Sequence, residues 1–173
     1  FIVSALGTLI LGIEEGILLG VVLSMAVLIY RVSYPHFAEL GLVGDGQIFR
    51  NVLRFQDAKV KDEIIVMRFD AQLYFANTSY FKEKVNALID KRKNPKYFIL
   101  DASPISALDS TAAHALHDLI EEMKKGGITF LLANAIGPVR DVLIKSGLEA
   151  QIGRDHSFMS LNDAYKFAIE KLA

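Results

Sequence analysis

The sequence predicts an α/β domain with parallel strands, preceded by a hydrophobic helical segment that belongs in a membrane. Residues 1–30 contain no Lys or Arg, and Glu14 and Glu15 are their only charged side chains. Beyond residue 47, short apolar runs typical of buried strands alternate with amphipathic helical patterns, which favours parallel pairing. One strand–loop–helix corner, residues 99–113, holds most of the candidate site residues.

The first thirty residues admit two interpretations. Residues 16–30 are 15 uncharged positions, about 22 Å of helix, which is shorter than the roughly 20 residues that cross a bilayer alone. The segment is therefore either one tilted helix of 30 residues or two helices with a break near residues 12–16. We favour the break, because two adjacent carboxylates inside lipid are costly.

Three glycines, Gly12, Gly16 and Gly20, recur at every fourth position and so share one helical face. Small residues at this spacing let a second membrane helix approach closely, and we expect packing against membrane helices outside this chain. Tyr30 and Arg31 end the apolar run, and Arg31 favours a cytoplasmic continuation.

The rest of the chain is expected to form a linker at 31–47 and one domain at 48–173. Pro35 and the glycines at 41, 44 and 46 predict little regular structure in the linker. We expect strands at residues 48–55, 64–69, 96–101, 128–133 and 157–160, with a short extended piece at 73–75. We expect helices at residues 77–93, 109–125, 138–145 and 161–172.

The corner after the third of these strands carries the candidate site. Asp101 ends the strand, and Asp109, Ser110 and Thr111 open the next helix, where side-chain oxygens cap free backbone N–H groups. Capping alone explains these residue types. The positive helix end beside two hydroxyls also suits an anion or a phosphoryl group, so both interpretations stay open.

Two further residues complete the candidate loop. Ser103 follows Asp101 in the loop, and Asn134 follows the next strand. Ligands of open α/β sheets bind beyond the carboxyl ends of the strands, so Ser110, Thr111 and Asn134 are a hypothetical nucleotide site. Alternatively, Asp101 and Ser103 only end the strand and satisfy loop amides.

Composition excludes several classes of function. With 19 basic and 20 acidic residues, the sequence lacks the charge footprint of a nucleic-acid-binding protein. It has no Cys, no phosphate-binding glycine loop and no nucleophile–base pair, so we expect neither an enzyme nor a cofactor. His114 and His117 are three apart, but no third ligand stands at a suitable spacing, so we expect no metal site.

Four motifs together resemble one family. The Asp101–Ser103 and Asp109–Ser110–Thr111 pattern is similar to the STAS domain, which occurs in anti-sigma-factor antagonists and in sulfate permease (SulP) anion transporters. Residues 12–20 resemble the last membrane region of the transporters, and residues 31–36 resemble their linker. Residues 68–77 resemble the second strand and the start of the first helix of their STAS domain. The resemblance implies a STAS fold, a mixed sheet with helices packed on it, and covers essentially the whole chain.

The resemblance also implies a function and partners. It implies a cytoplasmic regulatory domain and terminal membrane helix of a multi-pass secondary transporter in the cell (inner) membrane, moving sulfate, bicarbonate or a similar anion. The fragment would not transport alone. Its partners would be the upstream transmembrane domain, the bilayer, a second copy in a homodimer, and a regulatory protein or nucleotide at the Asp109 loop.

The alternative is a signalling adaptor on a membrane anchor. In the antagonist branch of the family, the serine directly after the loop aspartate is phosphorylated by a partner kinase. Here that position is Ser110, so the alternative is an adaptor switched by phosphorylation of Ser110.

Overall fold

The computed structural model describes residues 2–44 and 48–173, which form two separate units, residues 1–34 and 35–173. The first unit contains helices α1 (Ile2–Leu11) and α2 (Ile13–Ser33). The helix α2 is, among the described residues, the one helix long and apolar enough to cross a membrane, with a mean hydropathy of 2.0.

The expected break between two helices is confirmed and lies at Gly12. Its φ of 114° is a conformation that side chains other than glycine rarely adopt. Gly16 has a partner within the chain: a Cβ on Gly16 would lie 2.5 Å from the Thr8 Cα, so α1 and α2 pack backbone to backbone there. The acidic residues of this unit, Glu14 and Glu15, lie in the first turn of α2, just after the break.

The second unit is a mixed six-stranded sheet with the order β2-β1-β3-β4-β5-β6. Strands β3 (Ile64–Phe69), β4 (Tyr97–Asp101), β5 (Thr129–Ala133) and β6 (Ser157–Phe158) are parallel. Strands β1 (Phe37–Val43) and β2 (Ile48–Asn51) extend the sheet in antiparallel pairing beyond β3. This is the mixed α/β fold that the sequence predicts.

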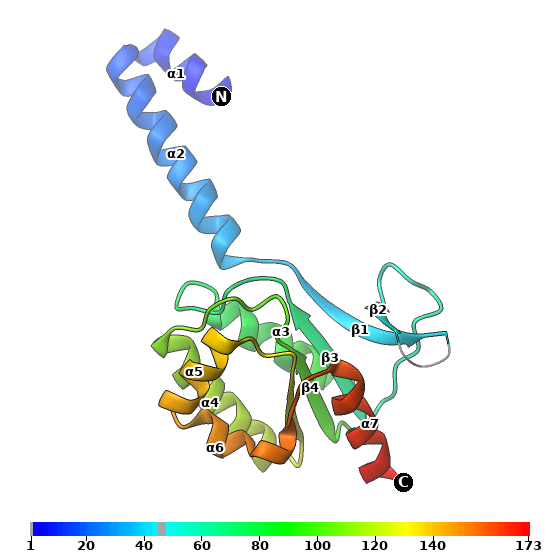
Figure 1. Cartoon of the computed structure of the whole chain (residues 1–173). Coiled ribbons are helices and arrows are strands. Elements are labelled where there is room, and N and C mark those ends of the chain that lie inside the picture. Colours follow the sequence, from blue (N-terminus) through cyan, green and yellow to red (C-terminus); the bar gives the residue numbers. More distant parts are fainter. Residues whose placement is uncertain (1, 45–47) are drawn as a thin grey trace. The chain divides into compact units, whose positions relative to one another are not determined.

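Helices cover both faces of the sheet (Figure 1). One face carries α3 (Thr78–Asp90), α4 (Ser110–Lys125), α5 (Gly137–Lys145) and α6 (Leu148–Ile152), and the other carries α7 (Leu161–Leu172). Alternate residues of the central strands enter two separate cores: Phe98 and Leu100 of β4 pack under α3 to α6, whereas Ile99 packs under α7. Burial on both faces explains the apolar runs in the sequence.

Several expected boundaries are wrong. The linker at 31–47 was expected to have little regular structure, but it contains β1, which pairs Phe37 with Phe69 and Glu39 with Met67. The last three residues of that expected linker, 45–47, lie outside the described residues. The strand expected at 48–55 ends at Asn51, and Leu73 forms only an isolated bridge with Leu108. The sequence analysis also missed α6 and a 3₁₀ turn at Arg154–His156.

Gly41 explains why β1 was missed. A Cβ at this position would lie 3.0 Å from backbone atoms of Ala58 and Lys59, and Lys59 exchanges two backbone hydrogen bonds with Leu42 of β1. Glycine is used here because two segments of backbone approach each other closely, not because the chain turns.

Candidate functional site

The carboxyl ends of β3, β4 and β5 meet at one edge of the sheet, and the candidate residues gather there. Asp101 lies at the end of β4 and is only 6% exposed. Its Oδ1 accepts hydrogen bonds from the Ser103 backbone N–H at 3.1 Å and from the Asn134 side-chain amide at 2.9 Å. Asn134 has a left-handed φ of 58°, which asparagine tolerates better than most residues. The structure therefore brings Asp101, Ser103 and Asn134 together as one network.

Asp109 is the N-cap of α4, as the capping interpretation predicts. Its Oδ1 accepts from the Ala112 backbone N–H at 2.7 Å, and its Oδ2 accepts from the Phe75 backbone N–H at 2.9 Å. The backbone of Asp109 also donates to the Leu73 carbonyl at 3.2 Å. Asp109 therefore fixes the start of α4 against the loop that follows β3.

Ser110 and Thr111 occupy the first turn of α4 with exposed side chains. Neither hydroxyl forms a hydrogen bond with any residue in the described part of the chain. The cap of α4 is thus Asp109 alone, and the two hydroxyls are accessible to solvent.

A groove of about 420 Å³ runs from Ser110 between α4 and α5. Its floor is apolar and its rim carries imidazole, ammonium and hydroxyl groups; the lining residues are Leu108, Ser110, Ala113, His114, His117, Val142, Lys145 and Ser146. Asp101 and Asn134 are not among them, so the six candidate residues form two groups rather than one pocket. Sequence reasoning missed this groove, although Ser110, His114 and His117 have the i, i+4, i+7 spacing of one helical face.

Three charged residues at the same sheet edge were also missed. Asp70, just beyond β3, accepts hydrogen bonds from Arg68 Nε at 2.6 Å, from Arg68 Nη2 at 3.2 Å and from His36 Nδ1 at 2.7 Å. Burial raises the pKa of Asp70, but the bonds from Arg68 and His36 outweigh it and hold that pKa below its usual value. The bond to Asp70, with the charge of Asp101 in addition, raises the pKa of Arg68.

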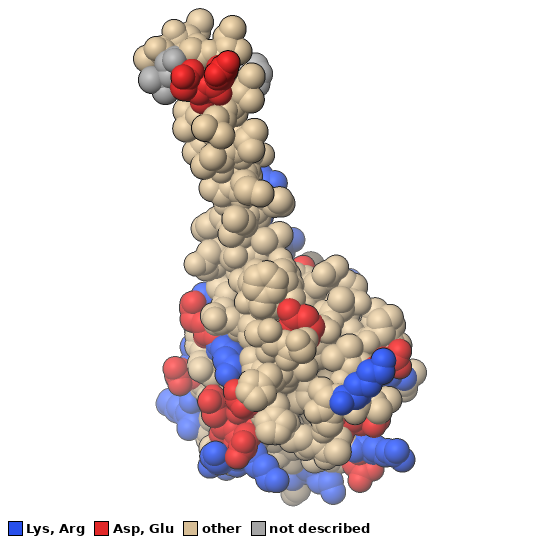
Figure 2. Space-filling view, turned by 90° about the vertical axis from the view of Figure 1, so that its left-hand side faces the viewer, with Lys and Arg blue, Asp and Glu red and all other residues tan. Residues whose placement is uncertain are grey.

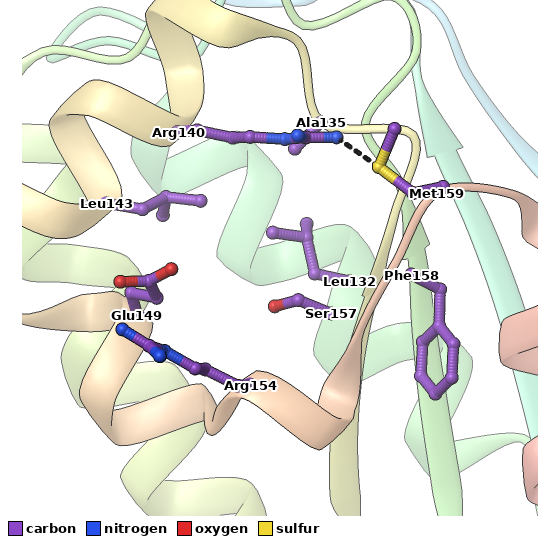
Figure 3. A pocket seen from close by; sticks show the side chains of 9 residues that line it. All are labelled: Leu132, Ala135, Arg140, Leu143, Glu149, Arg154, Ser157, Phe158 and Met159. Atoms are coloured by element: carbon purple, nitrogen blue, oxygen red, sulfur yellow. Dashed lines mark hydrogen bonds between the residues drawn. The ribbon is translucent and has the colours of Figure 1, made fainter.

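A second cavity, of about 210 Å³, lies between α5, α6 and the end of β6 (Figure 3). Arg140 extends across it and donates to the Met159 sulfur at 2.8 Å, a weak acceptor. Arg154 extends from the opposite wall toward the side of Glu149. The wall therefore carries both signs of charge, and it contains none of the residues that the sequence analysis selected.

Metal binding has no support in the part of the chain that is described: residues 2–44 and 48–173 contain no group of three or more His, Asp or Glu side chains placed to hold an ion. Figure 2 shows acidic and basic side chains interspersed over the visible face of the domain.

Comparison with known proteins identifies the family. The STAS domain family matches residues 56–164. A probable sulfate transporter 4.2 of Arabidopsis thaliana is 36% identical over 96% of the chain, and a probable sulfate transporter of Mycobacterium tuberculosis is 34% identical over 89% of it. The chain spans only 26% and 28% of these relatives, about a quarter of their length. Neither relative is named as an enzyme.

Solved structures agree with this assignment. The murine Solute Carrier 26 family member A9 anion transporter, in its inward-facing state, matches 98% of the chain with 28% identity and a TM-score of 0.84, and 28% of that structure is covered. The SulP transporter STAS domain of Vibrio cholerae matches 69% of the chain with a TM-score of 0.57 and 20% identity, which shows the fold alone.

The match covers 91% of that chain, so the Vibrio structure contains little besides its own STAS domain. The present chain belongs to the STAS domain family, in the form that makes up the C-terminal part of SulP-type sulfate transporters.

Proposed function

We propose that this chain is the regulatory STAS domain and the terminal membrane helices of a SulP-type secondary transporter of sulfate, bicarbonate or a similar anion. The observation that carries the proposal is the extent of the match. Relatives named as sulfate transporters align with 96% and 89% of the chain, well beyond the STAS domain itself. The chain alone does not enclose a transport pathway, and the substrate site belongs to an upstream transmembrane domain.

The geometry of the helical unit supports this role. α2 is long and apolar enough to span a bilayer, and its close contact with α1 at Gly16 is typical of membrane helices. Arg31 in the last turn of α2 supports a cytoplasmic domain on an inner-membrane, multi-pass protein. Because the family resemblance implies a homodimer, dimerisation through the membrane part is included in the proposal.

The groove beside Ser110 is the proposed regulatory surface. An apolar floor with a polar rim suits a segment of a regulatory protein, and the accessible Ser110 hydroxyl stands at its end. A phosphoryl group on Ser110 would lie at the positive end of α4 and within the same groove as Lys145, so it would change both the charge and the shape of the docking surface.

The decisive experiment is anion uptake into proteoliposomes. The whole protein that carries this chain is compared with a form that ends before residue 35, and both are checked for insertion. We expect uptake of labelled sulfate or bicarbonate by the whole protein and a changed rate after truncation. If neither form moves any tested anion, the transporter proposal fails.

The second candidate function is the membrane-anchored adaptor switched at Ser110, which the accessible hydroxyl favours. It predicts no uptake, together with phosphorylated Ser110 in protein taken from native cells. Mass spectrometry that never finds the modification removes this candidate.

A nucleotide at the Asp109 loop is tested separately. Ser110 and Thr111 would have to act with Asn134, which does not line the Ser110 groove. Calorimetric titration of residues 35–173 with ATP and GTP decides the matter: heat at millimolar ligand supports nucleotide binding, and its absence removes it.

A further inference from the structure

The segment that joins β2 to β3 combines exposed apolar side chains with positive charge. We name residues 48–61 the basic arm. Its exposed apolar residues are Ile48, Leu53, Phe55 and Val60, and Leu53 is 91% exposed. Its exposed cations are Arg50, Arg54, Lys59 and Lys61, against one acid within the arm, Asp57; Asp62 and Glu63 follow the arm before β3 begins. Because the whole sequence holds 19 basic and 20 acidic residues, this excess of positive charge is local.

The two kinds of side chain occupy the same surface. In β2, Phe49 points inward and packs edge-on against Tyr165 of α7, with ring centroids 5.3 Å apart. Strand alternation therefore places Ile48 and Arg50 on the opposite, outward face. The guanidinium of Arg50 lies 5.7 Å from the centroid of the Phe55 ring, which brings Phe55 to that face as well.

The cations of the basic arm differ in their ion pairing from other cations of the described domain. None of the four forms an ion pair with a residue in 2–44 or 48–173, whereas cations elsewhere, such as Arg68 and Arg92, pair with Asp70 and Glu39. Figure 1 shows the arm, in cyan to teal, at the edge of the domain away from α4 to α6. The arm is held in place by the backbone bonds between Leu42 and Lys59, at 2.8 Å in both directions.

We propose that the basic arm binds the surface of a bilayer that contains anionic phospholipid, with Leu53 and Phe55 inserted among the headgroups. Apolar side chains interleaved with Arg and Lys are the chemistry of interfacial membrane binding, and each cation near such a surface strengthens binding about fivefold. This inference rests on the proposed function, because it needs α2 in a membrane.

Covalent connection makes the bilayer the favoured occupant. The arm begins 15 residues after α2 ends at Ser33, so the chain keeps it within roughly 50 Å of the end of that helix. Attachment to the same chain as α2 raises the effective concentration of the surface around the arm. Weak individual contacts are then sufficient for stable binding.

The test places a fluorescent reporter on the arm of the whole chain. The sequence contains no cysteine, so Leu53→Cys gives a single labelling site for an environment-sensitive dye. The labelled chain is reconstituted into vesicles of phosphatidylcholine alone or with one third phosphatidylglycerol. Ile144→Cys is the matched control, since Ile144 is also exposed, at 57%, but lies on α5 outside the arm.

We expect a blue shift of the Leu53 dye in the anionic vesicles only, and no lipid dependence for the Ile144 dye. Replacing Arg50, Arg54 and Lys59 by Gln in the labelled chain should reduce the shift, as should high salt. The proposal is wrong if the fluorescence of the Leu53 dye is the same in neutral and in anionic vesicles. It is also wrong if the dye shows a blue shift in detergent that grows with protein concentration, because the arm then binds a second copy of the chain.

A failure of the proposed function gives a different result from a failure of the arm proposal alone. If the chain is removed from the vesicles by an alkaline wash, α2 does not span the bilayer, and both proposals fall. If the chain resists the wash but the Leu53 dye does not respond, only the arm proposal is wrong.

Discussion

Asp109 and Phe75 are joined by a hydrogen bond of 2.9 Å that links the first turn of α4 to the loop after β3. The same carboxylate caps α4 through Ala112. One side chain thus holds together two segments, 34 residues apart in the sequence, at the edge where the candidate site lies. The position of Ser110, the next residue, depends on both bonds.

Asp109→Ala should destabilise the domain by about 1–3 kcal/mol, because the helix loses its cap and the Phe75 N–H loses its acceptor. Urea unfolding of residues 35–173 measures the change. Ser110→Ala is the matched control and should stay within about 0.5 kcal/mol, since its hydroxyl has no partner among the described residues. Equal losses in the two variants would show that Asp109 is not the cap.

A negative charge at Ser110 should stabilise the domain, whereas the same charge at Ser146 should destabilise it. Both residues line the groove, but Ser110 begins α4 and Ser146 is the C-cap of α5, so their helix dipoles have opposite effects. We expect about 0.3–1 kcal/mol in each direction for Ser110→Glu and Ser146→Glu, measured by thermal unfolding at low salt. Effects of the same sign would contradict the electrostatic argument.

Asp70 should contribute to stability at neutral pH and lose that contribution in acid. Its pKa in the folded domain lies below the ordinary value, so the unfolded chain takes up the proton first as the pH falls. The contribution is complete above about pH 5 and disappears as the pH falls below about 4 toward the folded-state pKa.

The measurement for Asp70 is urea unfolding of the wild type and Asp70→Asn at neutral pH and near pH 3. The difference between the two proteins should shrink in acid. A difference that is the same at both pH values would mean that the charge of Asp70 does not matter to the fold.

Asn134 should be sensitive to substitution for two separable reasons. Asn134→Gly keeps the left-handed backbone but removes the amide that bonds Asp101, and Asn134→Ala adds backbone strain of about 1 kcal/mol. We expect the alanine variant to be less stable than the glycine variant by about that amount, in parallel urea titrations. Equal stability would show that the φ of 58° costs nothing.

The domain should need β1 in order to fold well. A fragment of residues 35–173 keeps the pairing of β1 with β3, whereas a fragment of residues 48–173 exposes the edge of β3 and loses the buried side chains of Ala38 and Leu40. We expect the shorter fragment to aggregate or to unfold at a markedly lower urea concentration. Circular dichroism and size-exclusion chromatography compare the two.

The boundaries of the strands show which elements could be predicted from the sequence. Strands β3, β4 and β5 are predictable because both of their faces are buried, so each is a continuous apolar run. The cap at Asp109 is predictable because capping is local. β1 is not, because the glycine that suggests a connector, Gly41, is required by the approach of Ala58 and Lys59, which only the folded chain brings near.

The same reasoning applies to the site. The pairing of His36 with Asp70 depends on β1 lying antiparallel to β3, and nothing near either residue signals that register. The groove beside Ser110 depends on α5 packing against α4, so Val142 and Lys145 join it from 32 and 35 residues further along the chain. Residue types at strand ends are visible in a sequence, but the neighbours that tertiary packing supplies are not.

The route by which the chain enters the domain determines how a mechanical displacement would be transmitted. The first residues of the domain form their backbone bonds with β3: the Asp70 N–H donates to the His36 carbonyl, the two side chains pair, and Phe37 lies opposite Phe69. The Phe37 ring also packs edge-on against Tyr80 of α3. A pull or twist on the end of α2 therefore loads the end of β3 before any other strand. From there it reaches Arg68, whose register partner is Asp101, so a movement of α2 would be passed along β3 to the candidate site.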